Sequence, residues 1–332
     1  MEENYFEYKD NFSKYKDVKS ILLYGNKENI PSPKITIAIP TYKRPHLIKD
    51  ALESAINQIN YDNYEIIVVD NDDTKDENET EQLIKGYQNP KILYYKNEKN
   101  IGMFGNWNRC IELARGEYIS ILNDDDWLEK EFLCETIKYI SHDKAILTLT
   151  KLNDFRKFKN TSENNFTYIF LRKIYNFFRK RKKYRELKLI DFFYSNRSAG
   201  TLGTLLKRDY SINLGGYNES FFPISDYVFH TNYCYKYGAL LINKELCNYR
   251  IQENESLKAA SSFPENDYKF RSFLTNFIKN KKKYDRLNYI ITENQKKKIN
   301  ITWGTNIPYN PAIVKKYYFL MLLFREINKS IW

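Results

Sequence analysis

The sequence predicts an α/β protein built on a mostly parallel sheet with helices on both faces, followed by a helical C-terminal extension. Within 34–122, short segments rich in β-branched residues alternate with segments of helical apolar spacing through four rounds. The expected strands are continuously apolar, as in sheets that are buried on both faces. The chain has 332 residues, of which 42% are hydrophobic, enough for one large domain or for two.

Four strands are expected, and three of them end at a polar cluster. Their ranges are 34–39, 64–69, 91–95 and 117–122. Pro40 and Thr41 follow the first strand, Asp70 follows the second, and the Asn-Asp-Asp-Asp run 123–126 follows the fourth. Ligands of open parallel sheets bind beyond the carboxyl ends of the strands. We therefore expect these three clusters to converge on one edge of the sheet.

Helices are expected between these strands and once more further along the chain. In 46–59, apolar residues recur at helical spacing. A polar helix is expected at about 75–87. The Asn-Ile-Gly segment 100–102 leads into a third helix near 104–114, and 227–237 is expected to form a later one. This alternation of strand and helix is typical of connections between parallel strands.

Three further segments lie outside this pattern. Residues 1–33 are polar and end in Pro-Ser-Pro, a natural boundary. The segment 166–188 interleaves aromatic and basic residues, so it either lies in an anionic membrane surface or forms a partly buried helix with a solvated basic face. The apolar segment 317–325 is too short to span a membrane. It is expected to pack in the core, cap the domain or form an oligomer contact.

Composition restricts the partners and the compartment. The net charge of +11, from 53 basic and 42 acidic residues, favours a polyanionic partner such as nucleotide phosphates, anionic lipid or nucleic acid. The four cysteines show no CxxC spacing, which disfavours a zinc site and is typical of a reducing compartment. The polar N-terminus does not resemble a signal peptide. We expect a cytoplasmic protein, with attachment to the inner face of the plasma membrane as an open alternative.

The acidic run 123–126 is the strongest chemical signal in the sequence. Carboxylates at the end of a buried strand repel one another and favour a hard divalent cation, Mn²⁺ or Mg²⁺. Such an ion often holds one or two protein carboxylates and fills its other positions with phosphate oxygens. A solvated acidic loop is the simpler alternative. No GxGxxG follows the first strand and no GxxxxGK[ST] is present, so a diphosphate would depend on metal and basic side chains.

The order and spacing of these motifs resemble the GT-A glycosyltransferases of family 2, which have a Rossmann-like sheet. The resemblance covers 34–128 and is carried by residues 39–44, 67–71, 100–102 and 116–126. Further on, 215–219 followed by 225–227 resembles the acceptor-side pattern of the family, and the likeness ends near Arg250. The resemblance implies metal-dependent, inverting transfer of a hexose from a nucleotide-diphosphate sugar, expected to be a UDP-sugar. The implied acceptor is a glycan, lipid-linked or protein-linked, in cell-surface glycan synthesis.

The resemblance also assigns site residues. The implied nucleotide contacts are Pro40, Thr41, Tyr42, Arg44, Asp70, Asn100, Gly102 and Asp124. Asp226 corresponds to the catalytic base, while Arg250 and Glu219 are candidate contacts to the diphosphate or the acceptor. Structural alternatives accompany these roles, because Asp70 is equally suited to cap a helix and Asp226 to be a first-turn acid. His230, on the helix of Asp226, is interpreted as a packing or surface histidine.

The metal ligand depends on the register of the acidic motif. One register places the ligand on Asp125, which we favour, whereas the other pairs Asp124 with Asp126 and favours Asp126. Both residues are therefore candidate ligands for Mn²⁺ or Mg²⁺, and Asp124 is an alternative contact to ribose hydroxyls.

The expected organisation follows from the extent of the resemblance. Residues 1–33 form an N-terminal extension, and 34–128 form the nucleotide-sugar-binding half. Residues 129–258 form the acceptor-binding half, with a basic insertion near 154–188, and 259–332 form a helical extension through which oligomers could form.

Two other functions are alternatives. A nucleic-acid-binding protein would explain the charge, but no nucleic-acid motif is present and the acidic edge argues against it. A sugar nucleotidyltransferase would need a Gly-rich, Lys-bearing loop after the first strand, which is missing.

Overall fold

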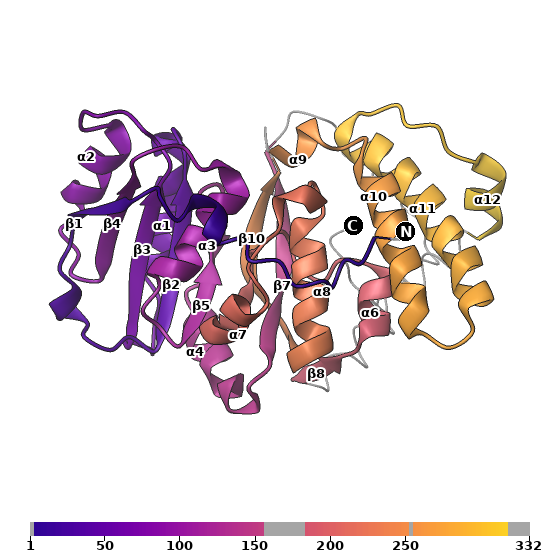
Figure 1. The fold of residues 1–332 in the computed structure, drawn as a ribbon, viewed down its shortest axis with the longest axis horizontal. Coiled ribbons are helices and arrows are strands. Elements are labelled where there is room, and N and C mark those ends of the chain that lie inside the picture. The colour runs from indigo at the N-terminus through magenta and orange to yellow at the C-terminus, as the bar shows by residue number, and fades with distance from the viewer. Residues whose placement is uncertain (1–2, 156–182, 252–254, 318–332) are drawn as a thin grey trace.

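A computed structural model describes residues 3–155, 183–251 and 255–317 (Figure 1). The predicted central strands are present as four parallel neighbours in one mixed sheet of ten strands. They are β2 (Ile35–Thr41), β3 (Tyr64–Asp70), β4 (Ile92–Asn97) and β5 (Tyr118–Ile121). The strand order is β1-β4-β3-β2-β5-β9-β7-β10-β6, and β8 pairs with β10.

The other strands extend this parallel core at both sides. They are β1 (Ser20–Tyr24), β6 (Trp127–Leu128), β7 (Ala145–Asp154), β8 (Tyr184–Leu187), β9 (Thr204–Lys207) and β10 (Ala239–Ile251). β9 is antiparallel to both β5 and β7, whereas β7 and β10 are parallel. The short antiparallel β9 therefore joins the core to a second parallel pair, which local sequence patterns do not predict.

The described helices lie on both faces of the sheet, as expected. They are α1 (Pro45–Ile56), α2 (Glu79–Gly86), α3 (Gly102–Leu113), α4 (Phe132–Thr136), α6 (Leu189–Tyr194), α7 (Arg208–Asn213), α8 (Ser225–Tyr237), α9 (Glu255–Lys258), α10 (Phe263–Leu274), α11 (Lys281–Trp303) and α12 (Pro311–Lys316). The helix predicted at 75–87 is shorter than expected. It begins after Asn78, whose side chain accepts a hydrogen bond from the backbone of Glu81 and caps α2.

Alternate strand residues enter two separate cores. On β3, Ile66 and Val68 pack with α1, α2 and α4, while Ile67 and Val69 pack with α3 and α8. This alternation follows from the two-residue repeat of a strand. It explains why the predicted strands are apolar throughout, because each face of the sheet is covered.

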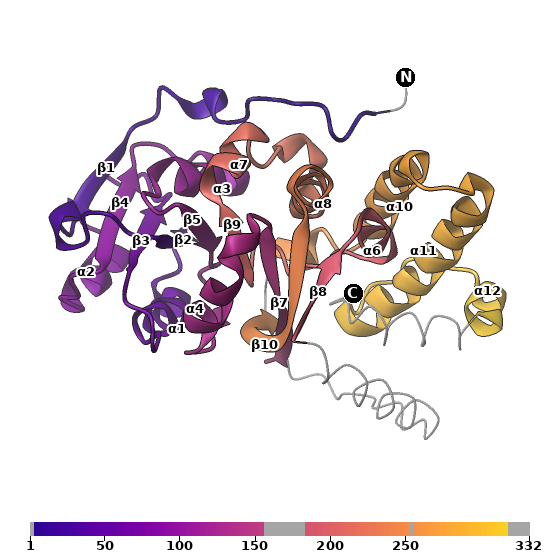
Figure 2. The same cartoon turned by 90° about the horizontal axis from the view of Figure 1, so that it is seen from below.

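The N-terminal extension is more integrated than its polar composition suggests. β1 pairs with β4 in the antiparallel direction and forms an edge of the sheet. The preceding residues run along one side of the molecule toward the C-terminal helices (Figure 2). There Tyr5 packs against Phe221, Phe270 and Phe273, with ring centroids 5.1–5.3 Å apart. This segment therefore ties the two ends of the described fold together.

Two predicted segments lie largely outside the described residues. The basic insertion near 154–188 is described only at its edges, where 184–187 form β8. The apolar segment 317–325 is described only at Tyr317. Across the described ranges, no helix combines the length and apolarity needed to cross a membrane. All four cysteines are free, in agreement with the lack of pairing expected from their spacing.

Candidate active site

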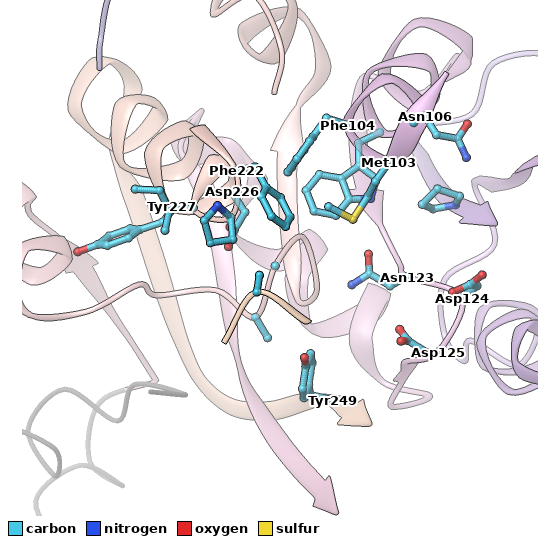
Figure 3. A pocket seen from close by; sticks show the side chains of 18 of the residues that line it. Met103, Phe104, Asn106, Asn123, Asp124, Asp125, Phe222, Asp226, Tyr227 and Tyr249 are labelled. Carbon is cyan, nitrogen blue, oxygen red and sulfur yellow. The ribbon is translucent and has the colours of Figure 1, made fainter. Parts of the chain in front are cut away.

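A pocket of about 530 Å³ lies beyond the carboxyl ends of β2 and β5 and continues to α8, α10 and α11. Nine residues singled out from the sequence line it: Pro40, Thr41, Tyr42, Arg44, Asn100, Gly102, Asp124, Asp125 and Asp226. Figure 3 shows Asp124 and Asp125 on one side of the pocket and Asp226 on the other. The clusters after the first and fourth predicted strands thus meet at one edge of the sheet.

The end of β2 and the acidic loop after β5 form one polar group. The Thr41 hydroxyl donates a hydrogen bond of 2.9 Å to Asp124. The Arg44 guanidinium lies 3.4 Å from the carboxylate of Asp124 and 3.5 Å from that of Asp125. Burial and the charge of Asp125 raise the pKa of Asp124 to about 6, although Arg44 and Thr41 oppose this shift. Two acidic side chains and one basic side chain therefore share this end of the pocket.

Asp126 occupies a different position from its two neighbours. Its carboxylate is fully buried and accepts hydrogen bonds from the backbone of Arg250 at 2.9 Å and from the Asn123 amide at 3.1 Å. Burial and the charge of Asp125 raise its pKa well above the ordinary value. Asp126 is absent from the pocket lining, which includes Asp125. Among the described residues, no three His, Cys, Asp or Glu side chains form a ready-made set of metal ligands.

Asp70 lies behind the pocket wall, and its neighbour Asn71 lines the pocket. The buried Asp70 carboxylate accepts hydrogen bonds from Tyr94 at 2.7 Å and from Asn78 at 2.9 Å. The Asn71 amide donates to Asn100 at 2.9 Å and so holds the loop that precedes α3. The strand-end signal therefore lies next to the pocket, but among these two residues it is Asn71, and not Asp70, that lines it.

Asp226 lies in the first turn of α8, at the opposite end of the pocket from Asp124. Its carboxylate accepts a hydrogen bond of 2.7 Å from the Asn196 amide. Burial raises the pKa of Asp226 to about 6, and the charge of Asp267 adds to the shift while Asn196 opposes it. A carboxylate with this pKa is ionised near neutral pH and is still basic enough to accept a proton.

A hydrogen-bond chain behind Asp226 fixes the orientation of Asn196. Its amide oxygen accepts from the backbone and hydroxyl of Ser198, both at 3.2 Å, so its nitrogen points to Asp226. The Ser198 hydroxyl also contacts His230 at 2.7 Å, and the other ring nitrogen of His230 contacts Tyr217 at 3.1 Å. Burial lowers the pKa of His230 to about 3, so its ring is neutral. The histidine is a packing residue, as interpreted from the sequence, with a polar connection to the site.

The hydrogen bonds from Ser198 to Asn196 should influence the proton transfer at Asp226. Ser198→Ala is expected to lower the turnover number about fivefold, the effect of one neutral hydrogen bond. Because Asn196 then holds Asp226 less firmly, the pKa of Asp226 should rise and the acid limb of the pH–rate profile should move upward. Ser195→Ala is the matched control, since the buried Ser195 hydroxyl has no partner among the described residues. If the pH–rate profile of Ser198→Ala is the same as that of the wild type, the hydrogen bonds from Ser198 to Asn196 have only a structural role.

The remaining candidates, Arg250 and Glu219, lie outside the pocket lining. The Arg250 side chain donates to the backbone of Asp125 at 2.9 Å and packs over the Trp127 ring at 5.1 Å, so it braces the acidic loop. Glu219 is exposed and forms an ion pair with Lys14 of the N-terminal segment. Contact of either residue with a diphosphate or an acceptor therefore stays a prediction.

Comparison with known proteins identifies a matching family. The model of glycosyl transferase family 2 matches residues 36–228. An uncharacterized glycosyltransferase of Methanocaldococcus jannaschii is 35% identical over 117 residues, which are 34% of this chain and 39% of that protein. The poly(ribitol-phosphate) beta-glucosyltransferase of Bacillus spizizenii is 32% identical over 124 residues, 36% of this chain and 19% of that protein. The chain thus spans two-fifths or less of the length of these curated relatives.

Solved structures share the fold. TarS 1–349 of Staphylococcus aureus, in complex with UDP-GlcNAc, aligns with a TM-score of 0.55 at 16% identity, covering 82% of this chain and 74% of that one. The mannosyltransferase PcManGT of Pyrobaculum calidifontis, in complex with GDP-Man and Mn²⁺, aligns with a TM-score of 0.54 at 14% identity, covering 90% and 84%. These likenesses confirm the predicted GT-A-like fold with its mostly parallel core.

Proposed function

The chain belongs to glycosyl transferase family 2, and on this basis we propose that it is a metal-dependent, inverting hexosyltransferase. The donor would be a nucleotide-diphosphate sugar, with a UDP-sugar as the first candidate, and the acceptor a glycan of the cell surface, free, lipid-linked or protein-linked. One observation carries the proposal: a single pocket has Asp124 and Asp125 at one end and Asp226 at the other. That separation suits a donor and an acceptor that meet between them.

The donor end is suited to a nucleoside diphosphate with a divalent cation. Asp125 lines the pocket with Asp124 beside it, and carboxylate oxygens are hard ligands that suit Mn²⁺ or Mg²⁺. Asp125 would hold the ion, and when bound the ion would act as a Lewis acid on the leaving diphosphate. Thr41 and Arg44 position Asp124, and Arg44 also supplies a positive charge at this end. Asp124 is then available for ribose hydroxyls, and Asp70 supports the wall that carries Asn71.

The acceptor end supplies the base. As the acceptor hydroxyl attacks the anomeric carbon, the bond from that carbon to the diphosphate oxygen breaks and a bond to the acceptor oxygen forms. Asp226 takes the hydroxyl proton in the same step. Asn196 holds one oxygen of Asp226, which limits rotation of the carboxylate. A single in-line displacement of this kind inverts the anomeric configuration.

We propose that the chain divides accordingly. Residues 34–128 would carry the donor, 129–258 would carry the base and part of the acceptor site, and 259–332 would complete the acceptor end. The name of the B. spizizenii relative supports a cell-surface polymer as the product class. Association of the basic insertion with an anionic membrane stays a prediction, because most of that insertion lies outside the described residues. Association of the C-terminal helices with a second copy of the chain also stays a prediction.

The raised pKa of Asp226 predicts the pH dependence of transfer. The base must be ionised, and burial moves its pKa from 3.8 to about 6. The turnover number should therefore be level above pH 6 and fall about tenfold per pH unit below it. Protonation of Asp124, whose pKa is also about 6, should instead weaken nucleotide binding. Separate pH profiles of turnover number and UDP affinity check both statements, and full turnover at pH 5 would contradict the assignment of Asp226.

A donor screen tests the proposed function as a whole. UDP-glucose, UDP-galactose, UDP-N-acetylglucosamine and GDP-mannose would each be incubated with the full chain and Mn²⁺ in the absence of acceptor. We expect slow release of nucleoside diphosphate from at least one of them, and its suppression by EDTA. Release from none of the four would contradict the proposed donor class, and release that EDTA does not affect would remove the metal from the proposal.

A further inference from the structure

The pocket continues past Asp226 into the C-terminal helices. Ala259, Phe263 and Asp267 line it from α10 and the turn before it, and Gln295 and Ile299 line it from α11. The family match ends at residue 228, so this wall belongs to a part of the chain that the match does not cover. The shared fold therefore does not determine what this end of the pocket binds.

Asp267 is held in place by a buried network on α11. The guanidinium of Arg271, only 2% exposed, donates to Asn288 at 2.6 Å, to Thr292 at 2.8 Å and to Gln295 at 3.3 Å. The Gln295 amide oxygen is thereby engaged, and its nitrogen donates to Oδ2 of Asp267. This network fixes the orientation of the Asp267 carboxylate through one of its two oxygens.

The second oxygen of Asp267 accepts no hydrogen bond from the described residues. The Asp267 side chain is only 12% exposed, and Asp267 is one of the residues that line the pocket. A buried carboxylate normally has partners for both oxygens. A pocket-lining carboxylate oxygen of this kind is an acceptor suited to a ligand hydroxyl.

The helix that carries Asp267 is packed directly on the helix of the proposed base. The Tyr227 ring, next to Asp226, contacts the Phe270 ring of α10 at 4.8 Å in an edge-on arrangement. The charge of Asp267 is also close enough to raise the pKa of Asp226. Hence a group bound at Asp267 would lie beside the hydroxyl that Asp226 deprotonates.

The chemistry of the wall favours an uncharged sugar over an anionic acceptor. Phe263 offers apolar surface for the C–H face of a ring, and Asp267 offers a carboxylate oxygen for one of its hydroxyls. Arg44 is the one basic side chain among the described lining residues, and it lies at the donor end. A phosphate near Asp226 and Asp267 would face two carboxylates with no cation opposite them in the lining.

We propose that α10 and α11 form an acceptor subsite for an uncharged sugar ring, with Asp267 accepting a hydrogen bond from a hydroxyl of that ring. The inference rests on the proposed function, because it assigns the acceptor of the same pocket. Asp267 would determine which acceptor is used, whereas Asp226 would perform the proton transfer.

Ligand-observed NMR with simple glycosides tests the subsite directly. The full chain, with UDP and Mg²⁺, would be titrated with methyl β-glucoside, methyl β-galactoside and methyl N-acetyl-β-glucosaminide, and with ribitol 5-phosphate as the anionic probe. At least one neutral glycoside should bind, and more tightly than ribitol 5-phosphate. Asp267→Asn should weaken that binding about tenfold, because a hydrogen bond to a charged group is lost.

Matched variants make each outcome decisive. Phe263→Leu should also weaken the glycoside while keeping the apolar packing, and it replaces Asp267→Asn if that variant fails to fold. Glu265→Gln alters an exposed carboxylate on α10 and should change nothing. UDP affinity, measured in the same samples, should be equal in all variants. The subsite alone would be overturned by any of three results: the wild type binds UDP but no glycoside, it prefers ribitol 5-phosphate, or neither substitution changes glycoside binding. Failure of the wild type to bind UDP would instead count against the proposed function.

Discussion

Asp226→Asn is expected to lower the turnover number for transfer by about 10²–10⁴-fold, the contribution of a well-placed general base. UDP affinity should be unchanged, because the nucleotide is proposed to bind at the Asp124 and Asp125 end of the pocket. The amide keeps the shape of the carboxylate and can still accept the hydrogen bond from Asn196. Steady-state transfer assays together with UDP calorimetry on the same preparations measure the two quantities.

The same substitution should make the fold more stable at pH 7. The folded pKa of Asp226 lies above its ordinary value of 3.8, so this group loses stabilisation as the pH rises from about 4 to 6. A pKa of about 6 corresponds to a cost of about 3 kcal/mol at neutral pH, which an amide avoids. An Asp226→Asn variant with a lower turnover number and a higher melting temperature would show that activity is lost with the base and not through unfolding. If Asp226→Asn keeps full turnover, Asp226 is only a first-turn acid, and Glu219 would need to leave its ion pair with Lys14 to replace it.

Asp125→Asn should abolish transfer and remove the effect of divalent metal on UDP binding. An amide keeps the size of the side chain but loses the charge that holds a cation. The ion pair of Asp125 with Arg44 is partly exposed, so the fold should tolerate the change. Turnover measurements and UDP titrations with Mn²⁺ and with EDTA provide the readouts.

Asp126→Asn is the contrasting variant, since it tests the register of the acidic motif. The Asp126 carboxylate accepts hydrogen bonds from two donors, and an amide would leave one donor facing an NH₂ group. In the folded fraction of Asp126→Asn, we expect UDP binding that still depends on metal. Near-normal activity for Asp125→Asn together with metal-independent binding for Asp126→Asn would show that the register is wrong by one residue.

The parallel core and the sheet edge at which the pocket lies could be predicted because their signals are local, whereas Asp226 was assigned through the family resemblance. Continuous apolar runs identify β2 to β5, and the polar residues that follow them identify the edge at which Asp124 lies. The difference between Asp70 and Asn71 was not predictable in this way. Which of two adjacent side chains faces the pocket depends on the packing of Tyr94 and Asn78 around one of them.

The groups that the sequence did not reveal are held by contacts between distant residues. Asn196 reaches Asp226 across 30 residues, and Arg271 reaches Gln295 across 24. Neither belongs to a motif, and neither spacing has a helical or strand period. Similarly, the polar composition of the N-terminal extension as a whole conceals β1, a short apolar run of five residues that pairs with β4 at the edge of the sheet.

Calorimetric titration of UDP into the full chain shows whether the Asp124 and Asp125 end of the pocket binds a nucleoside diphosphate together with a divalent cation. We expect saturable binding in Mn²⁺ that weakens by about tenfold or more in EDTA, because no glycine-rich loop is available to hold the diphosphate. We also expect Asp125→Asn to bind UDP in Mn²⁺ as weakly as the wild type does in EDTA. Equal affinity of the wild type in Mn²⁺ and in EDTA, or no binding in either, would contradict this proposal.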